Sequence, residues 1–123
     1  MGTWDVGPYD NDGAVDLLAD IREGSFNFER FRFNINEYRP DPDDSEMIIA
    51  LGALASSGTE ELPEGIRSEV LTRLFTPERV RWVRRQMERI LDPESSELHA
   101  VWEATGELDG WLAATRAALP GDR

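Results

Sequence analysis

The chain has 123 residues and a net charge of −12, because 25 acidic side chains outnumber 13 basic ones, all of them arginine. This length is enough for one domain with a single buried core, and the acidic balance argues against general nucleic-acid binding and against adhesion to anionic membranes. The absence of cysteine excludes disulfides, thiol catalysis and cysteine-ligated metal sites, and the absence of lysine excludes Schiff-base chemistry and a P-loop.

The N-terminal residues precede any helical periodicity. They include Trp4 and Tyr9 among glycines and a proline, so we expect an irregular lead-in that packs onto the core through these two rings. They lack the basic start and apolar run of a signal peptide. The longest apolar run of the chain, residues 47–55, is far shorter than the roughly 18 residues that span a bilayer. We therefore expect a cytoplasmic protein.

The first helix is predicted over residues 12–23. Asn11 and Asp12 form a typical start signal, in which a short polar side chain caps the helix. Apolar residues follow at the spacing of one helical face: Ala14, Leu17, Leu18 and Ile21. Gly24 stands where a C-terminal glycine commonly ends a helix.

Residues 25–38 fit two patterns. One set alternates as in a strand: Phe31, Phe33 and Ile35. Another set has helical spacing: Phe28, Phe31, Ile35 and Tyr38. A single short strand would have no partner in a chain otherwise rich in helix signals, so a helix is favoured. The proline-containing residues 39–44 are expected to end it.

The third predicted helix is capped by Asp44 or Ser45 and is apolar on nearly every face. Its apolar members are Met47, Ile48, Ile49, Ala50, Leu51, Ala53, Leu54 and Ala55. A helix of this kind is usually the central one, because neighbours bury it all round. The polar residues 56–59 are expected to end it.

Two helices are predicted between residues 63 and 91. The first is short and begins at Pro63. The second has Thr76 as its cap and Pro77 at its first position, an arrangement typical of helix starts. Its apolar stripe runs to about Leu91.

The last 25 residues are predicted to form two short helices, because Gly106 and Gly110 weaken any continuous one. Ser95 or Ser96 caps the first of them. Taken together, residues 1–123 predict an all-α fold: a single-domain bundle of six or seven helices with an irregular N-terminal lead-in.

Four aspartates near the N-terminus form the densest carboxylate cluster: Asp10, Asp12, Asp16 and Asp20. Three of them, Asp10, Asp12 and Asp16, could supply oxygen ligands for Mg²⁺ or Ca²⁺. The calcium-loop pattern fails, since counting from Asp10 puts Ala14 at the third ligand and Val15 at the required glycine. Spacing of four instead places the last three on one solvated ridge of the first helix. We favour the ridge and keep a metal site as the alternative.

His99 is the only histidine, and no nucleophile-elbow pattern accompanies it. It is interpreted as an exposed or half-buried helix residue, because catalysis would need an oriented partner and a nucleophile. Three tryptophans are expected to anchor the core: Trp4, Trp102 and Trp111.

The fifth predicted helix combines a tryptophan with a local excess of arginine. Between residues 78 and 89 it has five arginines and two glutamates, a local charge of +3. A helical wheel places Trp82 away from the apolar stripe, near Arg85 and Arg89. The favoured interpretation is that Trp82 fills a second packing interface while the arginines pair with acidic residues. The alternative is a partner-binding patch of Trp82, Arg85 and Arg89, since Trp and Arg are frequent at binding hot spots.

The N-terminal pattern resembles that of a known family. Its motif residues are Gly2, Trp4, Gly7, Asn11, Asp12, Ala14 and Asp16, and further matching pairs are Ser45-Glu46, Leu62-Pro63 and Val101-Trp102. On these residues the chain resembles the bacterial domain of unknown function 4259 over nearly its whole length. The family often has a glutamate in its third helix where this chain has Gly52, so any chemical role of that glutamate would be missing here. The resemblance implies the fold and a bacterial cytoplasmic setting. It carries no activity over to this chain, because the family has none assigned.

Two function hypotheses follow. The first is a non-enzymatic protein-interaction module, regulatory or immunity-like, that binds another protein, with no cofactor, nucleic acid or membrane; a basic partner would fit the acidic charge. The second is a divalent-metal-dependent or carboxylate-driven enzyme that uses Asp10, Asp12 and Asp16. Sequestration of a ligand inside the bundle is a third possibility, and the sequence leaves the oligomeric state open.

Overall fold

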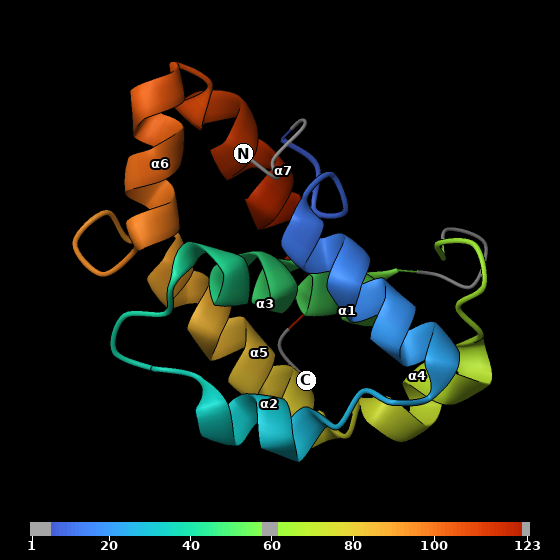
Figure 1. The fold of residues 1–123 in the computed structure, drawn as a ribbon. Helices are drawn as coiled ribbons and strands as arrows, with labels where there is room; N and C mark the ends of the chain where they lie inside the picture. Colours follow the sequence, from blue (N-terminus) through green and yellow to red (C-terminus); the bar gives the residue numbers. More distant parts are fainter. Residues whose placement is uncertain (1–5, 58–61, 122–123) are drawn as a thin grey trace.

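Seven α-helices follow one another in the computed structural model, which describes residues 6–57 and 62–121. In chain order they are α1 (Asp12–Glu23), α2 (Phe28–Asn34), α3 (Pro42–Ser56), α4 (Ser68–Leu74), α5 (Pro77–Ile90), α6 (Glu97–Thr105) and α7 (Leu108–Ala117). No strand occurs among the described residues, which confirms the predicted all-α fold. Helix α3 lies in the middle, with α1, α5 and α6 packed against it (Figure 1).

Helix α1 has the predicted bounds because both of its ends are capped. The side chain of Asn11 accepts a hydrogen bond from the Ala14 N–H at 2.7 Å, which satisfies one of the unpaired donors of the first turn. At the other end Gly24 adopts a left-handed φ of 74°, a conformation that glycine takes without steric cost. The predicted apolar stripe faces the core, and each of its four members is buried.

Helix α2 settles the ambiguous segment in favour of a helix, although a shorter one than the pattern suggested. The Asn27 side chain caps it by accepting from the Arg30 N–H at 2.9 Å. Ile35 is already extended, with φ −84° and ψ 143°. Phe33, a member of the strand-like alternation, is 88% exposed and does not belong to the core.

Helix α3 begins at Pro42, earlier than predicted. Asp41 is its N-cap and accepts from the Asp44 N–H at 2.8 Å. Pro42 is at the first helical position, where its missing N–H costs nothing. This proline therefore begins α3, whereas it was expected only to end the preceding helix. The prediction of a central helix is confirmed, because nine of the fifteen residues of α3 are buried.

Helices α4 and α5 differ in how well their starts were predicted. Helix α4 begins at Ser68, five residues after Pro63, because a turn with φ 83° at Gly65 intervenes. Its N-cap residue, Arg67, makes no side-chain capping bond. Helix α5 begins as predicted, with Thr76 accepting from the Arg79 N–H at 3.2 Å.

Helices α6 and α7 are separated at Gly106, which has a left-handed φ of 81°. Ser96 caps α6 as predicted, while Gly110 lies inside α7 and does not end it. Trp102 and Trp111 stack with their ring centroids 6.3 Å apart, and both are buried, which confirms that they anchor the core. The expected packing of Trp4 lies outside the described residues. Within these residues no helix combines the length and the apolar character needed to cross a membrane.

Candidate functional site

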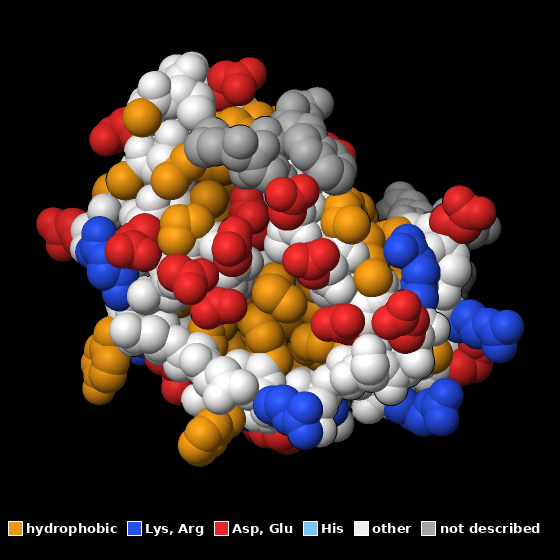
Figure 2. Space-filling view, in the orientation of Figure 1, with side chains coloured by type: hydrophobic (Ala, Val, Ile, Leu, Met, Phe, Trp, Pro, Cys, Tyr) orange, Lys and Arg blue, Asp and Glu red, His pale blue; other side chains and the backbone are white. Residues whose placement is uncertain are grey.

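Helices α1, α2 and α3 enclose an apolar hollow on one face of the protein, here called the acidic groove. Figure 2 shows its apolar centre with acidic side chains around it. The groove has a volume of about 350 Å³. Its lining residues are Asp20, Ser25, Phe26, Asn27, Arg30, Phe31, Asn34, Asp44 and Met47.

The floor of the groove is formed by Phe26, Phe31 and Met47, which are partly buried against the core. The two phenylalanine rings lie 5.8 Å apart between centroids and are tilted by 50°. The end of α1 fixes Phe26, because its backbone N–H donates to the carbonyl oxygen of Asp20 at 3.2 Å. The floor is therefore held by the same turn that ends α1.

Two walls of the groove present carboxylates. Asp20 lies on α1, one turn after Asp16, and Asp44 lies in the first turn of α3. Burial is the main cause that raises the pKa of Asp44, and the nearby charges of Asp41 and Asp43 raise it further. The ionised Asp44 is thus held in a position that disfavours its charge.

The raised pKa of Asp44 predicts a pH-dependent gain in stability when this residue is replaced by asparagine. Because the folded protein binds this proton more tightly than the unfolded chain, the free energy of unfolding falls as pH rises from the ordinary value of 3.8 through the raised pKa. Asp44→Asn removes the ionisable group and therefore this loss of unfolding free energy. Urea unfolding should therefore show the variant gaining stability relative to the wild type between pH 3 and pH 7. A difference that is the same at both pH values would contradict this assignment.

The N-terminal aspartates proposed as an alternative metal site are not brought together. Asp10 is in the turn before α1, where its backbone N–H donates to the carbonyl oxygen of Gly7 at 3.2 Å, while Asp12 and Asp16 are exposed on α1. In residues 6–57 and 62–121 no three carboxylate or imidazole side chains are grouped so that they could hold a metal ion. Asp12 and Asp16 fit the solvated ridge, with Asp12 in the first turn of α1.

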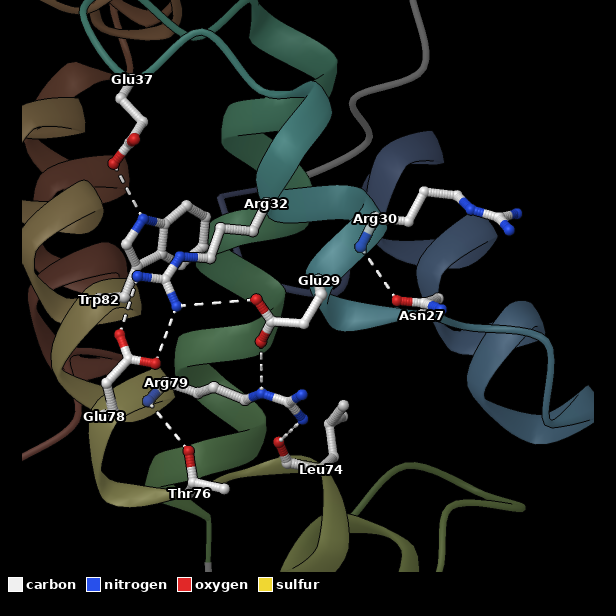
Figure 3. A network of polar contacts seen from close by, with 10 residues as sticks. All are labelled: Asn27, Glu29, Arg30, Arg32, Glu37, Leu74, Thr76, Glu78, Arg79 and Trp82. Atoms are coloured by element: carbon white, nitrogen blue, oxygen red, sulfur yellow. Dashed lines mark hydrogen bonds and ion pairs between the residues drawn. The ribbon is translucent and has the colours of Figure 1, made fainter.

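Trp82 lies inside the protein and is only 1% exposed. Its indole Nε1–H donates to the carboxylate of Glu37 at 2.9 Å (Figure 3), and the buried Gln86 donates to the same oxygen at 2.9 Å. Its ring packs edge-on against Phe28, with centroids 5.6 Å apart. Trp82 is buried, as the packing interpretation expects, so its ring is not available on the surface for the alternative patch with Arg85 and Arg89.

The arginines around Trp82 connect α2 to α5 (Figure 3). Arg32 pairs with Glu78 at 2.8 Å and lies over the Trp82 ring at 5.4 Å. Arg79 pairs with Glu29 at 2.9 Å. The bond to Arg32 is the main cause that lowers the pKa of Glu78. Both arginines are half-buried and both glutamates are exposed. Pairs near the surface contribute about 0.2–1 kcal/mol each, so they orient α2 more than they stabilise it.

Arg85 and Arg89, the two arginines of the proposed patch, are both exposed on α5. Arg89 donates to the backbone carbonyl of Glu37 at 2.7 Å. This contact holds the connection between α2 and α3 onto α5. Arg89 therefore has a structural contact within the protein itself.

Gly7 and Asn11 of the N-terminal motif lie near Glu46 of the central helix α3. This carboxylate is only 6% exposed and, with Gly7, Asn11, Trp102 and Trp111, borders an enclosed space of about 10 Å³. That volume suits no more than a single water, so this part of the bundle interior cannot sequester an organic ligand. Gly2 and Trp4 of the motif lie outside the described residues.

His99 is 7% exposed, so the expectation of an exposed or half-buried residue is wrong. It follows Leu98 in the first turn of α6 and meets the Trp111 ring edge-on, with centroids 6.1 Å apart. The sequence reasoning missed both His99 and Glu46 as buried polar residues. A possible signal for Glu46 was its position three and four residues before the apolar Ile49 and Ala50 on α3.

The fold is thus that of a small all-α protein with an acidic, apolar-floored groove. Residues 2–114 match the family model described as Domain of unknown function (DUF4259). Because the match covers most of the chain, the protein belongs to this family, and the resemblance seen in the sequence is confirmed. No curated protein and no solved structure matches the chain.

Proposed function

We propose that this protein is a non-enzymatic protein-interaction module of the bacterial cytoplasm, regulatory or immunity-like, that binds a basic partner protein through the acidic groove. The observation that carries the proposal is the pairing of an apolar floor with carboxylates on two walls (Figure 2). The floor offers surface that a partner can bury, and the carboxylates attract and orient a cationic partner. The net charge of −12 extends this attraction over the whole molecule.

Solubility alone is a weaker explanation for the acids at the groove. Many proteins are acidic only to stay soluble, and fully exposed carboxylates serve that purpose best. Asp44 is partly buried and stands close to Asp41 and Asp43, which raises its pKa. A cation from a partner would relieve this repulsion. The unfavourable placement of Asp44 beside the apolar floor of the groove therefore supports binding of a partner rather than a role in solubility alone.

The test compares proteins co-purified from the native host by three forms of the protein. The wild type is expected to enrich a protein of basic isoelectric point, and Asp20→Asn with Asp44→Asn is expected to lose it. Glu103→Gln is the matched control, because Glu103 is an exposed carboxylate on α6, away from the groove lining. Raising the salt from 0.1 to 0.5 M should weaken the interaction, since exposed charges are then screened. An enriched partner that is acidic, or that the double variant retains, would contradict the proposal.

A further inference from the structure

The acidic groove has room for one or two side chains. Its volume of about 350 Å³ is near the lower end of the range for small-molecule pockets. A whole helix or a folded domain cannot enter a hollow of this size. A partner would therefore insert a side chain into the groove and place the rest of its contact surface on the surrounding helices.

The charges around the groove differ from wall to wall. Asp20 on α1 and Asp44 on α3 give these two walls negative charge. The α2 wall carries Arg30 and Asn34 instead. Figure 3 shows the Arg30 side chain extending away from the pairs that join α2 to α5, and its backbone N–H is the group that Asn27 caps. The groove thus accepts cations on two sides and repels them on the third.

From this arrangement we infer that the partner docks through a segment in which one large apolar side chain is flanked by lysine or arginine. The apolar side chain contacts Phe26, Phe31 and Met47. The cations contact Asp20 and Asp44. The inference rests on the proposed function and adds the chemistry of the docking segment. Arg30 sets the direction in which the docking segment lies in the groove. A segment placed the other way round would bring one of its cations against the guanidinium of Arg30.

Charge decides between the possible occupants of the groove. A second copy of this chain brings a net charge of −12, so two acidic faces would repel each other. Anionic membranes and nucleic acids are repelled for the same reason. A basic polypeptide segment with an apolar anchor matches both the walls and the floor.

The experiment uses three synthetic twelve-residue peptides and the full chain. The first has a central tryptophan flanked by lysines, the second replaces the tryptophan with serine, and the third replaces the lysines with glutamine. Fluorescence anisotropy of labelled peptides at 0.1 M salt gives the dissociation constants. The first peptide is expected to bind at least about tenfold more tightly than either of the others, because only it uses both the floor and the walls.

Variants of the groove separate its two components. Met47→Gln should weaken the first peptide about tenfold and leave the second unchanged, whereas Asp20→Asn with Asp44→Asn should weaken both. Phe33→Ala is the control, because Phe33 is an exposed aromatic residue that does not line the groove. Arg30→Gln should bind the first peptide about threefold more tightly by removing repulsion. Thermal unfolding of Arg30→Gln shows whether this variant is folded, and a gain of affinity in the folded variant remains informative if another variant is unstable.

Each outcome has a distinct meaning. Tighter binding of the first peptide, with the expected pattern of variants, supports the inference. Equal binding of the first and second peptides overturns it and leaves the proposed basic partner intact, because the walls alone then account for the affinity. Loss of binding of both lysine-containing peptides in the wild type contradicts the proposed function as well.

Discussion

Replacing Trp82 with alanine is expected to lower the free energy of unfolding by about 3–5 kcal/mol, the range for deleting a large buried aromatic side chain. The side chain is 1% exposed and packs against Phe28 and Phe31, with ring centroids 5.6 and 6.4 Å away. Its removal leaves a cavity between α2 and α5 and deprives Glu37 of a donor. For a chain of this length the midpoint of thermal unfolding should fall by about 10–20 °C.

Two variants of α5 make this measurement specific. Arg85→Ala changes an exposed residue on the same helix and should alter stability by no more than about 0.5 kcal/mol. Trp82→Phe keeps a ring in the interface while removing the Nε1–H bond to Glu37, so its loss should be smaller than that of alanine. If Trp82→Ala costs less than about 1 kcal/mol, the packing described for α2 on α5 is wrong.

Replacing Gly13 with alanine is expected to destabilise the protein by about 1–3 kcal/mol, the usual cost of overpacking. A Cβ atom on Gly13 would lie 2.9 Å from the backbone carbonyl oxygen of Asp43 and 3.0 Å from Cβ of Glu46. Backbone atoms cannot turn aside as a flexible side chain does, so α1 and α3 would have to move apart. Helix propensity alone predicts the opposite sign, a gain of up to about 1 kcal/mol.

Gly110 provides the matched control for this substitution. It lies in the first turn of α7, and a Cβ there would be 3.6 Å from the nearest side-chain atom of Val6, an ordinary contact. Gly110→Ala should therefore stabilise the protein by about 0.4–1 kcal/mol. Chemical denaturation of both variants gives the two signs. A gain for both substitutions would show that α1 does not approach α3 as closely as described.

Local sequence signals predicted the starts of α1, α5 and α6, each of which has a short polar side chain as its N-cap. Asn11, Thr76 and Ser96 each accept a backbone N–H three residues ahead, at 2.7–3.2 Å, and the helices that follow begin where expected. The start of α3 was missed because Pro42 was interpreted as a breaker although it occupies the first helical position. The start of α4 was missed because Arg67 provides no side-chain cap.

The groove and the burial of Trp82 depend on how helices pack, which the spacing within one helix does not determine. A helical wheel placed Trp82 on a different side from the apolar stripe. This placement is correct when α5 is considered in isolation. Its burial follows from α2, since Phe28 and Phe31 cover the ring. The groove floor likewise joins Phe26, Phe31 and Met47 from separate parts of the chain. None of these residues belongs to a recognisable motif.

The position of α2 between the groove and α5 couples these two parts of the protein. A helix of seven residues is too short to persist on its own, so α2 stays folded through its contacts with α5. The same helix supplies one wall of the groove. The apparent affinity of the groove therefore scales with the fraction of molecules in which α2 is docked. Occupancy of the groove should in turn slow hydrogen exchange of the α2 amides, because a ligand that needs the docked state suppresses local opening.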